Sequence, residues 1–127
     1  MTILLICLII VVMLPLLAKM PLAWAMNKEG GYNNAYPRSQ QAQLKGFGAR
    51  ALAAHQNAFE AVILFTPAVL TAIVTNNIGD TVQWAAIIFV VMRLLYNLFY
   101  LLNYHILRSM SWVAAMACSF YMMLQAL

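Results

Sequence analysis

The chain has 127 residues, of which 65% are apolar and only 8% charged, and its formal net charge is +4. A soluble domain carries about a quarter charged residues, so this composition cannot cover a water-exposed surface. The mean hydropathy of +0.84 indicates a lipid environment. These values exclude a disordered protein, a disulfide-rich secreted module and most soluble enzymes. A basic excess in a membrane protein usually sets topology, so we expect no nucleic acid partner.

Long uncharged runs predict four transmembrane helices in one domain that covers residues 1–127. A span needs about 20 mainly apolar residues. The four predicted helices cover residues 2–26, 46–75, 81–105 and 109–126. The expected fold is therefore all-α: an integral membrane four-helix bundle with one long and two short connections.

The three connections differ in charge, which predicts the orientation of the chain. The first holds Lys19, Lys28, Arg38 and Lys45, and the third holds Arg108. The second holds Asp80 and no basic residue. By the positive-inside rule, we expect the first and third connections in the cytoplasm and both termini on the other side.

The first connection is the only long polar segment, at residues 27–44. Gly30 and Gly31 mark it as a loop. Pro37 suits the first position of a helix, so the next helix can also begin there.

Three ionisable residues, Arg50, Glu60 and Arg93, are predicted at depths where a charge costs about 2.5–3.5 kcal/mol. On the second helix, Asn57 lies about 20° and Glu60 about 80° from Arg50, so the three share one broad face. Asn57 and Glu60 are three residues apart and can touch. His55 points about 140° away from Arg50, which favours a backbone hydrogen bond or an interfacial position over a ligand contact.

A polar stripe is predicted along the third helix. It comprises Arg93, Tyr96, Asn97, Tyr100 and Tyr104. The other members lie within about 60° of Arg93, and the stripe extends about 16 Å along the axis, whereas an interfacial belt of tyrosines would gather at one depth. A lipid-facing stripe would leave the guanidinium unpaired, so we expect it to face protein, water or a polar ligand. An ion pair between Arg93 and Glu60 is the structural alternative, and it is compatible with a ligand role.

The excess of arginine over glutamate predicts the chemistry of a partner. Guanidinium groups prefer carboxylates and phosphates, which accept paired N–H bonds. We therefore expect a small anion with several acceptors, and the lipid setting admits an apolar second substrate. His55 and His105 have no cysteine or carboxylate at ligand spacing, so no metal is expected.

Three segments carry a resemblance to a known family. The run from Arg50 to Glu60, RALAAHQNAFE, resembles the second-helix signature of the MAPEG family, the membrane-associated proteins in eicosanoid and glutathione metabolism. The segment GGYNNAYPRSQ resembles the stretch that precedes it in bacterial members. The pattern of Arg93, Tyr96 and Tyr100, followed by Arg108, is similar to the end of the family's third helix. The resemblance extends over essentially the whole chain.

The resemblance implies a homotrimer of four-helix protomers that binds glutathione between protomers and conjugates it to apolar electrophiles from the bilayer. The implied glutathione-binding residues are Arg50, Asn57, Glu60, Arg93, Tyr96 and Tyr100. Arg108 matches the arginine that stabilises the glutathione thiolate in catalytic members. Further candidates are His55, Tyr104 and Arg38.

Two other functions stay open on the sequence. The first is a non-catalytic lipid-binding or accessory membrane protein on the same fold, because a fold does not settle an activity. The second is a small four-helix transporter. A proton-coupled exporter of this size is expected to carry a carboxylate in its first helix, and the first helix here has no acidic residue before Lys28.

Overall fold

The computed structural model describes residues 1–125 and 127, and helices are the regular secondary structure of this part of the chain. The helices are α1 (Thr2–Lys28), α2 (Pro37–Ala42), α3 (Phe47–Val74), α4 (Asp80–Leu101) and α5 (His105–Leu124). Within the described residues, α1, α3, α4 and α5 are long and apolar enough to cross a membrane. The predicted all-α fold with four spanning helices is confirmed.

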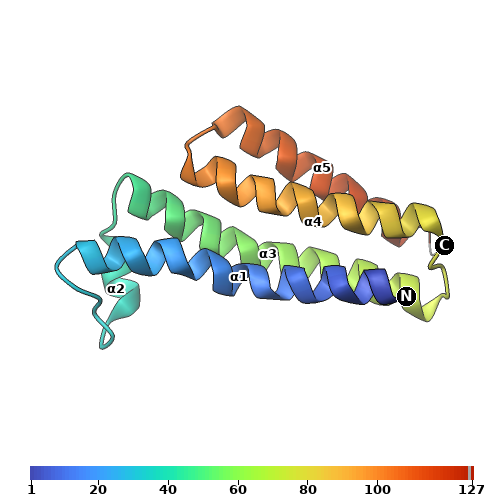
Figure 1. Cartoon of the computed structure of the whole chain (residues 1–127), viewed down its shortest axis with the longest axis horizontal. Coiled ribbons are helices and arrows are strands. Elements are labelled where there is room, and N and C mark those ends of the chain that lie inside the picture. Colours follow the sequence, from blue (N-terminus) through green and yellow to red (C-terminus); the bar gives the residue numbers. More distant parts are fainter. Residues whose placement is uncertain (126) are drawn as a thin grey trace.

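The four long helices run along a common axis in two pairs (Figure 1). α1 packs mainly on α3 and α4 mainly on α5, while α3 also contacts both α4 and α5. Both termini and the α3–α4 turn lie at one end, and α2 and the α4–α5 turn lie toward the other. Each long helix therefore crosses the bundle once, and α3 is the element that joins the two pairs.

Small side chains along α3 allow this close packing. Its buried face is largely alanine: Ala51, Ala54, Ala58, Ala61, Ala68 and Ala72. Small residues let helix backbones approach closely in a membrane, where dispersion rather than the hydrophobic effect drives association. Phe65 is a large exception, and its ring stacks on Phe89 of α4 with 4.3 Å between the ring centroids.

The helices α3 and α4 end in the same hydrogen-bonded motif. In α4, the N–H of Asn103 donates to the carbonyl of Tyr100, and the N–H of Tyr104 donates to the carbonyl of Phe99. Asn103 has φ 64° and Asn76, at the end of α3, has φ 55°. This is a Schellman motif, in which a left-handed residue lets two carbonyls of the last turn find donors. Asparagine tolerates that conformation better than other residues with a Cβ atom.

The turn at Asn103 corrects the predicted bounds of the last two helices. α4 ends at Leu101 rather than at residue 105, and α5 begins at His105 rather than at residue 109. Tyr104 therefore lies in the turn and not on the polar stripe of α4. Arg108 lies in the first turn of α5, rather than in a connection.

The first connection also differs in detail from the prediction. Pro37 opens the six-residue helix α2 and not the next membrane-spanning helix. Lys19, assigned to the basic first connection, lies within α1. The Nε2 group of Gln40 donates to the carbonyls of Met26 and Gly31 at 2.9 and 2.8 Å. Gln40 therefore fastens the loop and α2 to the end of α1.

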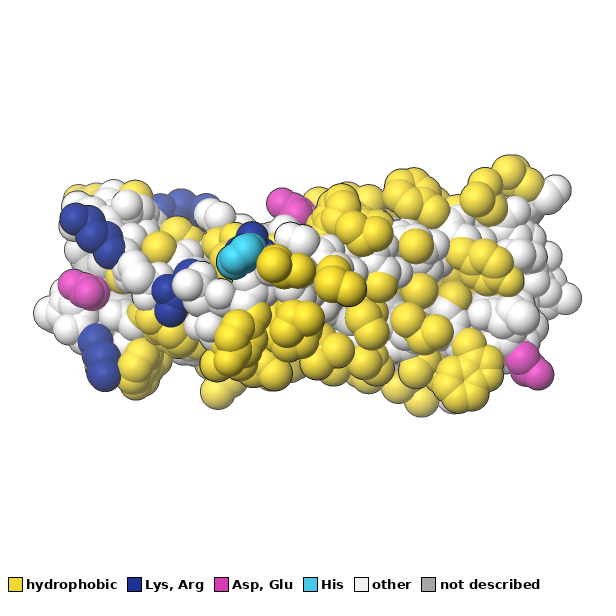
Figure 2. Space-filling model, turned by 90° about the horizontal axis from the view of Figure 1, so that it is seen from above, with side chains coloured by type: hydrophobic (Ala, Val, Ile, Leu, Met, Phe, Trp, Pro, Cys, Tyr) yellow, Lys and Arg dark blue, Asp and Glu magenta, His cyan; other side chains and the backbone are white. Residues whose placement is uncertain are grey.

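Charged side chains are concentrated at the end of the bundle that carries α2. Figure 2 shows lysine and arginine gathered there on the visible face, with a broad apolar surface over much of the remainder. Asp80 begins α4 at the opposite end. This distribution agrees with the predicted orientation in the membrane, which stays a prediction.

Candidate functional site

Arg93 is the centre of a polar network between α3 and α4. Its side chain is 0% exposed, and its Nη2 group donates to the backbone carbonyl of Asn57 at 2.7 Å and to the Oδ1 atom of Asn57 at 2.5 Å. The Nδ2 group of Asn57 donates to Glu60 Oε2 at 2.7 Å. The predicted contact between Asn57 and Glu60 is confirmed, and Arg93 is linked to Glu60 through the asparagine.

The guanidinium of Arg93 has hydrogen-bonding capacity beyond this network. Its Cζ atom lies 4.5 Å from the ring centroid of Tyr96, a cation–π contact. Its Nε and Nη1 groups are buried and have no hydrogen-bond partner in the described part of the chain. An unpaired buried donor costs about 1–3 kcal/mol. An anionic acceptor that reached these donors would therefore be stabilised, and in the protomer the whole Arg93 side chain is buried.

Arg50 lies on the same side of α3, facing the end of α4. Its side chain is half-buried, and its Nε group donates to the carbonyl of Leu101 at 3.3 Å. Leu101 is the last residue of α4, where carbonyls lack partners within the helix and the helix dipole is negative. Arg50 therefore caps the C-terminal end of α4. Arg50 and Asn57 were predicted to share one face of α3, and both contact α4.

A second cluster lies between α4 and α5, and we call it the Arg108 cavity. The Cζ atom of Arg108 lies 4.3 Å from the ring centroid of Tyr100, and Tyr100 meets Tyr96 edge to face at 5.5 Å. The cavity measures about 260 Å³ and is lined by Tyr96, Tyr100, Arg108, Ser109, Trp112 and Val113. It combines one guanidinium and three hydroxyl groups with an apolar wall, and Tyr96 connects it to Arg93.

A third cluster, the basic cavity, lies among α1, α2 and α3. It measures about 330 Å³ and is lined by Lys19, Tyr32, Pro37, Arg38, Gln41, Leu52, His55, Gln56 and Phe59. The Nδ1 atom of His55 is 2.9 Å from the carbonyl oxygen of Pro15, and because a carbonyl only accepts, Nδ1 is the donor. The predicted backbone bond of His55 is confirmed. Arg38 and His55 thus line a different cavity from Arg108.

Comparison with known proteins decides the family. The MAPEG family model matches residues 3–127, essentially the whole chain.

The chain belongs to the MAPEG family.

This confirms the predicted membership, and the family includes glutathione transferases and related enzymes. No curated protein and no solved structure matches the chain. The role of this MAPEG protein therefore has to be argued from its own side chains.

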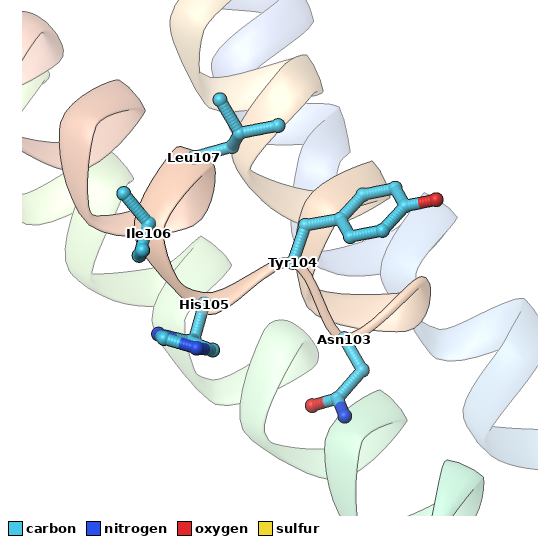
Figure 3. A pocket seen from close by; sticks show the side chains of 5 residues that line it. All are labelled: Asn103, Tyr104, His105, Ile106 and Leu107. Atoms are coloured by element: carbon cyan, nitrogen blue, oxygen red, sulfur yellow. The ribbon is translucent and has the colours of Figure 1, made fainter.

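Tyr104 lies apart from the Arg108 cavity and the basic cavity of this MAPEG chain. It is 54% exposed and lines a separate cavity of about 250 Å³ at the α4–α5 turn. Figure 3 shows Tyr104 and His105 pointing away from one another at this turn. The placement of Tyr104 on the stripe was wrong because the left-handed Asn103 interrupts the helix before it.

Sequence reasoning missed several residues that line the two cavities of this MAPEG chain. Ser109 and Trp112 follow Arg108 by one and four residues, so a helix beginning at His105 would have placed all three near one another. Neither Ser109 nor Trp112 is among the predicted site residues. Lys19 was counted only as a topology signal, since nothing in the sequence relates it to His55.

Proposed function

We propose that this MAPEG protein is a membrane-bound glutathione transferase, which conjugates the glutathione thiolate to apolar electrophiles that arrive from the bilayer. The observation that carries the proposal is the Arg108 cavity. A guanidinium lies 4.3 Å from the ring centroid of Tyr100 in a cavity lined by both polar and apolar side chains. Such a cavity suits a reaction between an anionic sulfur and an apolar partner.

Arg108 is assigned to the sulfur of glutathione. A free thiol has a pKa near about 8.5, so only a few per cent is thiolate at neutral pH. A guanidinium beside the sulfur stabilises the anion and lowers the pKa of the thiol. The thiol proton passes to water, and the thiolate attacks the electrophile to form a carbon–sulfur bond. Near neutral pH, each tenfold gain in thiolate corresponds to about 1.4 kcal/mol.

The network around Arg93 is assigned to the peptide part of glutathione, which carries two carboxylates and an ammonium group. The unpaired N–H groups of Arg93 would donate to a carboxylate, and charge-assisted bonds of this kind are among the strongest in proteins. The exposed carboxylate of Glu60 would accept from the ammonium group. Arg50, Asn57, Tyr96 and Tyr100 complete the proposed binding set.

A homotrimer would bring the two cavities together. The Arg108 cavity is lined by α4 and α5, whereas the basic cavity is lined by α1, α2, α3 and the loop before α2. A tripeptide in the seam between two protomers would contact α4 and α5 of one copy and the basic cavity of the next. In this arrangement Arg38 and His55 become glutathione-binding residues of the adjoining copy.

The test is Arg108→Ala in detergent-purified protein. We expect the ultraviolet absorbance of bound glutathione thiolate to fall near neutral pH, and the rate of conjugation to an aryl halide to fall about tenfold or more. The loss should shrink as the pH rises, because the thiol then ionises without assistance. Arg108→Lys should retain part of the rate, since lysine keeps the positive charge but lacks the planar guanidinium group with its paired N–H donors.

Lys45→Ala is the matched control, because Lys45 is an exposed cation outside the Arg108 cavity. If Arg108→Ala matches the wild-type rate between about pH 6 and 8, the thiolate assignment is wrong. If the wild type shows no rate above buffer, the enzyme assignment is wrong.

A second function is favoured by one observation. An apolar groove of about 440 Å³ lies between α4 and α5, away from Arg108, and is lined by Thr81, Trp84, Ala85, Ile88, Ala117, Cys118 and Tyr121. An acyl chain would fit the chemistry of this groove, which supports a non-catalytic lipid-binding or accessory role. Glutathione binding without thiolate absorbance or conjugation would favour that role over the transferase.

A further inference from the structure

Trp112 forms part of the apolar wall of the Arg108 cavity. It lies on α5 four residues after Arg108, so both project from neighbouring turns of one helix face. Its side chain is 40% exposed, and Val113 lines the same cavity. An interfacial anchor needs only lipid beside it, whereas this indole shares a cavity with the cation assigned to the thiolate.

We propose that Trp112 is a specificity-determining residue of this cavity, which favours planar, electron-poor aromatic electrophiles over aliphatic ones. The inference rests on the proposed glutathione transfer and assigns the preference among its second substrates to one side chain. The indole face is electron-rich, and aromatic rings attract in offset-stacked geometry when their charge distributions complement one another. A ring that carries electron-withdrawing groups would therefore stack on Trp112 with its reactive carbon near the sulfur.

The cavity also suits the charge that develops in such a reaction. The thiolate attacks a ring carbon that bears chloride, a carbon–sulfur bond forms, and the negative charge spreads over the ring and its nitro groups. The carbon–chlorine bond then breaks and chloride leaves, while the thiol proton has already passed to water. The hydroxyl-bearing side chains of Tyr96 and Tyr100 line the same cavity, where donors already in place stabilise developing negative charge.

The experiment compares two electrophiles in the detergent-purified wild type and in Trp112→Leu. The aromatic one is 1-chloro-2,4-dinitrobenzene, and the non-aromatic one is trans-2-nonenal, which adds the thiolate at its β-carbon and takes a proton from water. We expect the ratio of kcat/KM for the aryl halide to that for the alkenal to fall about fivefold to tenfold, mainly through KM. Trp112→Phe should restore most of the ratio because it keeps a flat ring.

Trp24→Leu is the matched control. Trp24 is an exposed tryptophan on α1 that packs against Phe47 and lies under the ammonium group of Lys28. It does not line the Arg108 cavity, so its loss should leave the ratio of the two electrophiles unchanged.

A binding measurement tests the same contact without relying on Trp112→Leu. The probe is S-(2,4-dinitrophenyl)glutathione, whose ring quenches tryptophan fluorescence at short range. With Trp24 and Trp84 replaced by phenylalanine, the remaining emission of Trp112 should be quenched saturably. Trp112→Phe, which retains the other two tryptophans, should show much weaker quenching.

The outcomes separate this inference from the proposed function. A wild type inactive toward both electrophiles overturns the transferase proposal and this inference with it. An active wild type whose electrophile ratio survives Trp112→Leu, or whose Trp112 emission is not quenched, overturns this inference alone.

Discussion

At the scale of single residues, Asn57 stabilises the buried charge of Arg93. Desolvating the guanidinium of Arg93 costs several kcal/mol. A position facing lipid would provide no polar partner to offset this cost. Asn57 accepts from Arg93 twice and donates to Glu60. The ring of Tyr96 adds a cation–π contact. The buried charge is thus held by a short chain of polar groups that ends at an exposed carboxylate.

Asn57→Leu tests this account of Arg93. Leucine keeps a similar size but removes the Oδ1 acceptor, while the backbone carbonyl bond remains. We expect the free energy of unfolding to fall by about 1–2 kcal/mol, since bonds to charged groups contribute about 1.5–3 kcal/mol in water-soluble proteins and somewhat less in membranes. Titration with a denaturing detergent in micelles measures it.

Gln56→Leu is the matched control for Asn57→Leu, because Gln56 is an exposed amide on the neighbouring position of α3. Equal stability of the two variants would contradict the role of Asn57 as the partner of Arg93.

The residues of the network could be predicted because they lie within regular helix. The angle between Asn57 and Glu60 follows from their spacing alone, and a charge at that depth requires a partner. The sequence could not tell that Arg93 reaches Glu60 through Asn57. That link depends on how α3 and α4 cross, which a single-chain pattern does not contain.

At the scale of elements, the residue at which α4 ends could not be predicted from the sequence. Asn97 and Asn103 lie in one continuous apolar run, and both are compatible with a helix. Asn97 stays helical, and its Nδ2 group donates to the carbonyl of Arg93 at 2.9 Å. Asn103 adopts φ 64° and ends the helix. Nothing local distinguishes the two residues, so the bounds of α4 and α5 and the placement of Tyr104 were wrong.

Asn103→Ala tests whether the left-handed turn sets this helix end. Alanine in the left-handed region costs roughly 1–2 kcal/mol, so we expect a loss of stability of about 1 kcal/mol relative to the wild type. Asn103→Gly should be neutral or slightly stabilising, since glycine adopts positive φ freely. Thermal unfolding in detergent compares the pair, and an alanine variant as stable as the glycine variant would contradict the motif.

At the scale of the whole molecule, the bundle is apolar over its length and basic at the end that carries α2 (Figure 2). This asymmetry predicts a cytoplasmic position for the first and third connections. The test introduces single cysteines into a chain in which Cys7 and Cys118 are replaced by alanine. A membrane-impermeant maleimide added to intact cells should label Thr75→Cys and leave Ser39→Cys unlabelled, because the two positions lie at opposite ends. The reverse pattern would invert the orientation.

The positions of the Arg108 cavity and the basic cavity bear on how copies of the chain would assemble. The Arg108 cavity and the basic cavity lie on different helices of one protomer, and glutathione would have to span both in a seam between copies. In that arrangement a single protomer holds only part of the proposed glutathione site. The candidate residues could be named from the sequence and its resemblance to the family, whereas a single-chain pattern does not contain how they would divide between two protomers.

The most direct measurement is an experimental structure of the protein in lipid with glutathione added. The account predicts a tripeptide between two copies of the chain, with its sulfur beside the guanidinium of Arg108 and its peptide part along Arg93, Tyr96 and Tyr100. A structure in which Arg108 and Tyr100 face the acyl chains, or in which the assembled protomers close the cavity and leave no space for the tripeptide, would contradict it.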